Sequence, residues 1–153
     1  MNKNPVLITC ACIFSENQGK QKWFLVKQDA SKWEIPKMVV RKGESSVRAA
    51  LRMMAEKGGM TVRVLEEVGR AGGVSTVNDK TIPQRYIYYL LLNKIPGGEA
   101  IGFNDSAWFE FPKAVKEVYS KREKQMLKAA KQVYTLWQKE RRKKKEQSPE
   151  DEA

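Results

Sequence analysis

Histidine is absent from the 153-residue sequence, and cysteine occurs only twice, at Cys10 and Cys12. Without histidine the chain lacks the commonest general base and cannot build a Ser-His or Cys-His nucleophile arrangement. Two cysteines separated by one residue cannot complete a zinc site alone and are poorly placed for a disulfide. Because residues two apart share one face of a strand, we predict that both side chains fill the core.

Long apolar runs are also lacking. The most apolar stretch, PVLITCACIF, is broken by Thr9, is preceded by a single cation at Lys3 and is not followed by a small-residue cleavage site. The stretch is therefore expected to be a buried strand and not an export signal. This pattern predicts a cytoplasmic protein without a membrane partner.

Acidic residues are outnumbered, with 18 Asp+Glu against 29 Lys+Arg and a formal net charge of +11. Residues 139–153 contain the basic run KERRKKKE, but their six basic and five acidic residues sum to only +1, which leaves +10 on the rest of the chain. Such an excess favours polyanionic partners such as nucleotides, nucleic acid or ribosomal surfaces. The length suits one compact domain.

The order of hydropathy patterns predicts a mixed α/β domain. Residues 5–15 and 22–28 are rich in β-branched and aromatic residues, and the turn ENQGKQ between them predicts a hairpin. A helix is predicted from Ser45 or Ser46, either of which can cap it, to the stop at Gly58 and Gly59. Further strands are predicted at 61–68, 70–77, 84–93 and 106–111.

The sequence after Pro112 predicts a long terminal helix. Its apolar stripe indicates core packing more than a binding surface, and it consists of Met126, Leu127, Ala130, Val133, Tyr134 and Trp137. Because the stripe stops at Trp137, we expect one domain over residues 1–137. Residues 138–153 are expected to form a disordered extension that is first basic and then acidic.

Residues 33–60, WEIPKMVVRKGESSVRAALRMMAEKGGM, resemble a Nudix box. The family pattern is a Gly, five residues, a Glu, seven residues, and then Arg-Glu-apolar-any-Glu-Glu-any-Gly-apolar. Pro36-Lys37 and Gly43-Glu44 match the flanking loop of the family, and the pattern itself is matched at Glu44, Arg52, Met54, Glu56, Gly59 and Met60. The resemblance covers roughly residues 5–137 and is nearest to members that act on diadenosine polyphosphates. It implies a Nudix α/β/α sandwich with a mixed β-sheet and a long C-terminal helix, with Glu44, Arg52 and Glu56 as the retained catalytic positions.

The sequence departs from the family pattern at three places. Met38 replaces the first Gly, Met53 replaces the Glu after Arg, and Lys57 replaces the last Glu. In the family these glutamates hold a divalent metal or activate water. Positions 53, 56 and 57 share one helix face, where the local charge falls from −3 to zero. One charge pair at about 4 Å is worth about 4 kcal/mol at an effective dielectric of 20, so magnesium should bind weakly, if at all, at Glu56.

The retained and replaced residues have alternative interpretations. Glu44 and Arg52 either contact a ligand or pair to fix the loop against the helix, and Arg52 and Glu56 are spaced to pair with each other. Lys57 is either solvated at the helix end or part of a metal-free polyphosphate site, whose other cations are Lys37, Arg41, Lys42 and Arg52. The rings of Trp33, Tyr86 and Tyr88 are candidates for stacking on a base, with core packing as the alternative.

Three functions are consistent with these patterns. The leading hypothesis is a Nudix-fold pseudoenzyme that binds a nucleotide or other phosphorylated ligand, with weak or no hydrolysis and no cofactor. The second is a working Nudix hydrolase that cleaves nucleoside diphosphate-linked substrates with Mg²⁺ or Mn²⁺, held by Glu44, Glu56 and one of Glu99, Asp105 or Glu110. The third is a module that binds RNA or ribonucleoprotein through the basic surface and tail.

Overall fold

The computed structural model describes residues 5–28, 31–94 and 100–147. Along the chain the elements are β1 (Val6–Asn17), β2 (Lys20–Lys27), β3 (Lys37–Val39), α1 (Ser46–Glu56), β4 (Val62–Val77), β5 (Lys80–Asn93), β6 (Asp105–Phe109), α2 (Phe111–Glu117) and α3 (Lys121–Gln147). The predicted mixed α/β order is confirmed. In this part of the chain no helix is long and apolar enough to cross a membrane.

The strands form one mixed sheet in the order β4-β5-β1-β2-β6, with β3 paired to β1. The predicted β1–β2 hairpin is present, with Phe14 opposite Trp23. The β1–β5 pair is parallel and all other pairs are antiparallel. A parallel pair needs a crossover connection, and here that connection contains α1, so the box helix is placed against the middle of the sheet.

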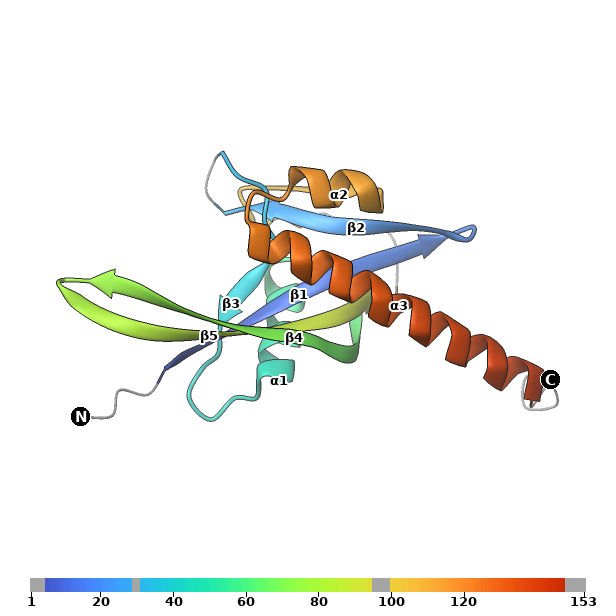
Figure 1. The fold of residues 1–153 in the computed structure, drawn as a ribbon, viewed down its shortest axis with the longest axis horizontal. Helices are drawn as coiled ribbons and strands as arrows, with labels where there is room; N and C mark the ends of the chain where they lie inside the picture. Colours follow the sequence, from blue (N-terminus) through green and yellow to red (C-terminus); the bar gives the residue numbers. More distant parts are fainter. Residues whose placement is uncertain (1–4, 29–30, 95–99, 148–153) are drawn as a thin grey trace.

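The side chains of β1 alternate between two hydrophobic clusters, one on each face of the sheet. Cys10, Cys12 and Phe14 face α2 and α3, whereas Ala11 and Ile13 face α1. Both cysteines are buried and free, as predicted, and burial raises the pKa of the Cys10 thiol to about 12. In Figure 1, α3 crosses in front of the sheet and α1 lies behind it, which is the α/β/α sandwich expected from the resemblance.

The strand pair β4–β5 is longer than predicted. The two strands expected at 61–68 and 70–77 form the single strand β4. The break expected between them coincides with the second of two register shifts in β4, which ends at Gly69. The start of β5 lies four residues earlier than expected and includes Pro83. Gln84 is the first residue of β5 that pairs with β1, so one edge of β5 is free before it, and a free edge tolerates proline. The two strands therefore extend past the sheet as a ribbon (Figure 1).

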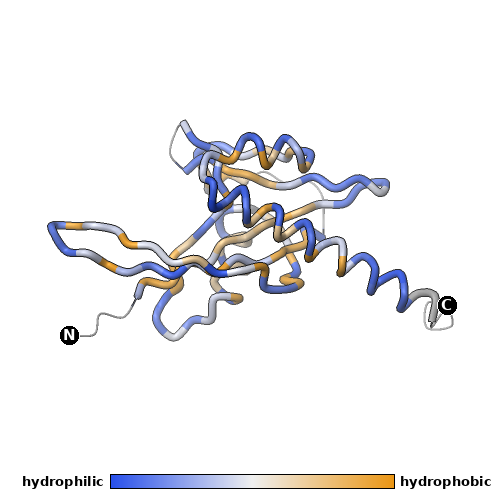
Figure 2. Tube along the Cα trace, in the orientation of Figure 1, coloured by the Kyte–Doolittle hydropathy of each residue, from blue (hydrophilic) through white to orange (hydrophobic). Residues whose placement is uncertain are grey.

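The C-terminal region corrects two expectations. The helix predicted after Pro112 is split into α2 and α3, and α3 continues ten residues past Trp137, to Gln147, where we expected a disordered extension. These ten residues are all Lys, Arg, Glu or Gln, which are strong helix formers even without an apolar stripe. Residues 138–144 are hydrophilic in Figure 2. The stripe itself is confirmed, with Leu127, Ala130 and Tyr134 buried. The acidic end at 148–153 lies outside the described residues.

Candidate functional site

The box helix α1 begins at a capped turn. The Ser45 hydroxyl accepts a hydrogen bond from the Arg48 N–H (3.1 Å). Of the two predicted candidates, Ser45 and Ser46, it is therefore Ser45 that caps the helix. Two residues before this cap, Gly43 has a φ of +78°, which glycine adopts without strain. The Glu44 N–H donates to the Arg41 carbonyl oxygen (3.0 Å). This tight turn folds the Glu44 side chain back toward the helix.

The three retained box residues contact one another in a chain. Arg52 donates from Nε to Glu44 Oε2 (2.8 Å) and from Nη2 to Glu44 Oε1 (3.0 Å), a bidentate pair. Arg52 Nη1 also lies 3.7 Å from Glu56 Oε2. Both predicted pairings are therefore present. Arg52 and, to a lesser degree, the Arg41 N–H lower the pKa of the Glu44 carboxyl to about 2, so Glu44 stays ionised and held against α1.

This arrangement makes a testable prediction about Glu44. In Arg52→Ala the main cause of the lowered pKa is removed, so we expect the Glu44 pKa to rise by about one unit or more. Because the Arg41 N–H still donates to Glu44, the pKa should stay below the ordinary glutamate value of 4.5. Carboxyl resonances followed by NMR through a pH titration measure the shift, with the exposed Arg48→Ala as control. Equal pKa values in the two variants would contradict the pairing.

Two of the replaced box positions lie in the core. Met53 is fully buried in the hydrophobic cluster beneath α1, where its neighbours include Ala50 and Met54. Met38, on β3, is partly buried and packs against the same cluster. The predicted packing role of Met53 is confirmed. A thioether thus occupies the helix position at which the box has a carboxylate, on a side of α1 that is closed by apolar side chains.

Lys57 is held at the C-terminal end of α1 by its backbone. Its N–H donates to the Met53 carbonyl oxygen (2.8 Å), and its own carbonyl oxygen accepts from the Gly102 N–H (3.0 Å). Gly102 packs so closely on Lys57 that a Cβ atom at Gly102 would overlap it. The Lys57 ammonium lies 5.9 Å from the centre of the Phe103 ring. The Lys57 side chain is half-buried. This burial is intermediate between that of a lysine solvated at the helix end and that of a lysine enclosed in a phosphate site.

Lys37 does not belong to the predicted phosphate site. Its ammonium donates to the Ile35 carbonyl oxygen (2.8 Å) and forms ion pairs with Glu34 (3.2 Å) and Glu123 (3.3 Å). Burial alone would lower the pKa of Lys37, but the two carboxylates outweigh burial and raise it. The expectation is corrected because Glu123, on α3, reaches across the core to this lysine.

The predicted aromatic platform is also corrected. Tyr86 and Tyr88 do share a face of β5, but α3 covers that face. Tyr88 is fully buried and its hydroxyl donates to Glu123 (2.9 Å). The Tyr86 ring lies 4.1 Å from the Arg122 guanidinium, and the Trp33 ring lies 4.8 Å from the Lys27 ammonium and 5.1 Å from the Phe109 ring.

The sequence interpretation missed Glu123, the most buried carboxylate of the described residues. It accepts hydrogen bonds from the Ile35 N–H, the Tyr88 hydroxyl and Lys37. A signal was present, because Ser120 and Glu123 have the S-x-x-E spacing of a capping box. Only half of that box forms, since Ser120 Oγ accepts from the Glu123 N–H (3.3 Å) while the carboxylate turns into the core.

Exposed or half-buried cations remain around α1. Arg41 and Lys42 are exposed in the loop before the helix. The Glu44–Arg52 pair and a hydrogen bond from Arg52 to the Val39 carbonyl oxygen (3.4 Å) hold that loop beside the helix. Arg41, Lys42 and Lys57 are therefore the residues of the predicted phosphate site that stay available, whereas Arg52 is held by Glu44 and Glu56. With Glu56 they form the candidate site.

The three carboxylates that were candidates to complete a metal site with Glu44 and Glu56 either have other roles or lie outside the described residues. The Asp105 carboxylate accepts from the Ser106 N–H (2.9 Å), and Glu110 occupies the N-cap position of α2. Glu99 lies outside the described residues. Across residues 5–28, 31–94 and 100–147, no three carboxylate, thiol or imidazole side chains are grouped so that they could hold a metal ion.

Residues 6–145 match the model of the NUDIX domain family. The crystal structure of C. elegans Ap4A hydrolase superposes with a TM-score of 0.67 at 20% identity, covering 86% of this chain and 99% of that chain. The NUDIX domain of Shewanella oneidensis NrtR, complexed with ADP ribose, gives 0.65 at 18% identity, covering 87% and 90%.

A mutT/nudix family protein from Listeria innocua gives a TM-score of 0.62 at 20% identity, covering 88% of this chain and 97% of that chain. A comparison with curated proteins found no match. At these identities the solved structures establish a shared fold. The family match, which spans most of the chain from β1 into α3, establishes that this protein belongs to the Nudix family.

Proposed function

We propose that the protein binds a nucleotide or another phosphorylated ligand at the loop and helix of the box, with weak or no hydrolysis. The observation that carries this proposal is the burial of Met53 in an apolar cluster, at the position where the family box has a glutamate. A thioether at 53, one carboxylate at 56 and an ammonium at 57 do not fit a hard divalent cation, which prefers several oxygen ligands.

The remaining charges support binding without a metal. Arg41 and Lys42 lie exposed beside α1, and Lys57 lies at its end, so three cations border the helix with Glu56 as the nearby carboxylate. Glu44 is neutralised by its bidentate contact with Arg52. Guanidinium and ammonium groups bind phosphate through charge-assisted hydrogen bonds. The positive balance favours a polyphosphate where a metal site would need a negative one.

The hydrolase alternative has one observation in its favour. The Glu56 side chain is 55% exposed, so its carboxylate is accessible to a metal ion brought in with a substrate. A divalent ion bound to substrate phosphates needs only one or two protein carboxylates. This alternative is therefore tested together with the proposal.

Binding and turnover are separated by one set of experiments. We expect Ap4A and ADP-ribose, the compounds named with the similar structures, to bind in calorimetry with EDTA present. Lys57→Ala and the double variant Arg41→Ala with Lys42→Ala should each weaken that binding about fivefold or more, since each lost contact to a charged group is worth about 1.5 to 3 kcal/mol before solvent screening. Lys128→Ala, an exposed cation on α3, is the control.

The same compounds should show little or no Mg²⁺- or Mn²⁺-dependent hydrolysis, well below the turnover of about 1 per second or more that is usual for enzymes. Turnover in that range, abolished by Glu56→Gln, would establish the hydrolase alternative instead. Affinity that is equal in wild type, Lys57→Ala and the double variant would remove the box loop as the ligand site.

A further inference from the structure

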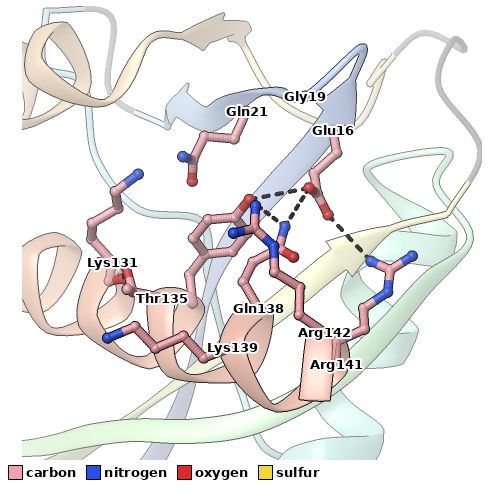
Figure 3. Close-up of a pocket in the computed structure, with 10 residues that line it drawn as sticks. Glu16, Gly19, Gln21, Lys131, Thr135, Gln138, Lys139, Arg141 and Arg142 are labelled. Carbon is pink, nitrogen blue, oxygen red and sulfur yellow. Dashed lines mark hydrogen bonds and ion pairs between the residues drawn. The ribbon is translucent and has the colours of Figure 1, made fainter. Parts of the chain in front are cut away.

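A basic hollow of about 590 Å³ lies on the face of the sheet opposite the box helix, between the β1–β2 hairpin and the C-terminal half of α3 (Figure 3). Its cations are Lys131, Lys139, Arg141 and Arg142. Figure 3 shows Lys131 and Lys139 on one side of the hollow and Arg141 on the other. Because α1 and α3 cover different faces, this hollow is separate from the candidate site at the box.

Glu16 is the single carboxylate that lines the hollow, and neighbouring side chains already bind it. Glu16 accepts hydrogen bonds from the Tyr134 hydroxyl (3.1 Å) and from Gln138 Nε2 (2.6 Å), and it lies 3.7 Å from Arg141 Nη1. Of the ion pairs between described side chains, none involves Lys131, Lys139 or Arg142. Three positive charges in the hollow are therefore available to an anion.

A second hollow of about 310 Å³ shares Arg141 with the first. It is lined by Arg63 from β4 and by Trp137, Glu140 and Lys144 from α3. The Arg141 guanidinium lies 5.1 Å from the centre of the Trp137 ring, so this arginine separates the two hollows. Together they hold six cations and two carboxylates, a net charge of +4.

The lining selects among anions. A small anion fills one hollow, whereas a chain of anionic groups can cross Arg141 and use both. The Gln21 side chain also lines the first hollow, and its buried oxygen has no hydrogen-bond partner among the described residues. Guanidinium groups beside an indole suit phosphates linked to flat rings. These features favour a nucleic acid strand over an acidic peptide.

We propose that single-stranded nucleic acid binds across these two hollows, with its phosphates on the cations of α3 and a base or sugar against Trp137. The site goes beyond the proposed function, since it uses neither the box nor a nucleotide pocket. The net charge indicates a polyanionic partner, and the proposal assigns the contacts with that partner to particular side chains. Several of these side chains belong to the helical residues of α3 beyond Trp137. Binding should be charge-driven and fall steeply with salt.

Fluorescence anisotropy on the full chain tests the proposal, with labelled 12-nucleotide oligo-U, oligo-dT and a DNA duplex of the same length at several salt concentrations. We expect both single strands to bind more tightly than the duplex. The double variant Lys139→Ala with Arg142→Ala should lose about tenfold or more in affinity. Its slope of log affinity against log salt should fall by about 1.4, because two phosphate contacts on a single strand are lost.

The matched control is Lys121→Ala with Lys128→Ala, which removes two exposed cations from the same helix outside both hollows. It should retain affinity within about threefold, because distant exposed charges are screened. Equal losses in the two double variants, or competition by poly-glutamate as effective as unlabelled oligo-U, would overturn the proposal in favour of unspecific charge. Lys57→Ala should leave oligo-U binding unchanged, which keeps this test independent of the box.

Discussion

Met53→Glu is expected to lower the free energy of unfolding by about 3 kcal/mol or more in the absence of divalent metal. The side chain at 53 is fully buried among apolar neighbours. An ionised carboxylate there loses its hydration and gains no cation. Met53→Leu, which conserves volume and polarity, should change stability by less than about 1.5 kcal/mol. Urea unfolding followed by circular dichroism measures both variants.

Adding Lys57→Glu to Met53→Glu turns the stability measurement into a test of the metal face. Together with Glu56 the two changes create three carboxylates spaced i, i+3 and i+4, with a local charge of −3. Manganese that binds only the folded state then stabilises it, by about 2.7 kcal/mol at a concentration 100 times its dissociation constant. The double variant should gain this stability and wild type should not.

The same double variant should bind Ap4A more weakly than wild type when EDTA is present, because an ammonium at the proposed site is replaced by a carboxylate. Two results would contradict this account. If Met53→Glu is as stable as Met53→Leu without metal, the side chain at 53 leaves the core. If manganese has no effect on the double variant, the helix face at 53, 56 and 57 is not able to bind a metal ion.

The elements whose residues repeat with a clear period were predictable from the sequence. Cys10 and Cys12 alternate with Ala11 and Ile13 along β1, and each pair faces one layer of the sandwich. The stripe on α3 has helical spacing, and its buried members lie where the spacing places them. Periodicity predicts such positions because burial on one face is a local property of the chain.

Local patterns did not predict the partners of the site residues. Lys37 and Tyr88 have the residue types of a phosphate site and a stacking platform, but both contact Glu123, which is 86 residues from Lys37 and 35 from Tyr88. The length of the ribbon formed by β4 and β5 was underestimated because local sequence rules treat Gly69 and Pro83 as residues that end a strand. The Glu44–Arg52 pair was predictable because both residues belong to the box pattern, eight residues apart, with Glu44 in the loop that leads into α1.

The buried contact between Glu123 and Lys37 should contribute more to stability than any exposed ion pair of the described residues. Glu123→Gln leaves the Lys37 ammonium with Glu34 as its remaining carboxylate, and breaking a buried pair by removing one partner costs about 3 to 5 kcal/mol. The matched control is Glu67→Gln, which breaks the exposed pair with Arg70 (2.9 Å) and should cost less than about 1 kcal/mol. Urea unfolding at neutral pH compares the two variants.

The same contact predicts how stability depends on pH. Since Glu123 and Glu34 raise the pKa of Lys37 above the ordinary lysine value of 10.5 in the folded state, the contribution of the contact to stability is fully present below pH 10.5. It is lost as the pH rises through the higher folded pKa. The stabilities of wild type and Glu123→Gln should therefore converge above about pH 10.5. Adding Lys37→Met to Glu123→Gln should restore part of the lost stability at neutral pH, because no unpaired ammonium stays buried. Equal stability of the single and double variants would show that the lysine reaches water once Glu123 is neutral, and that the cost comes only from the lost hydrogen bonds of the Ile35 N–H and the Tyr88 hydroxyl.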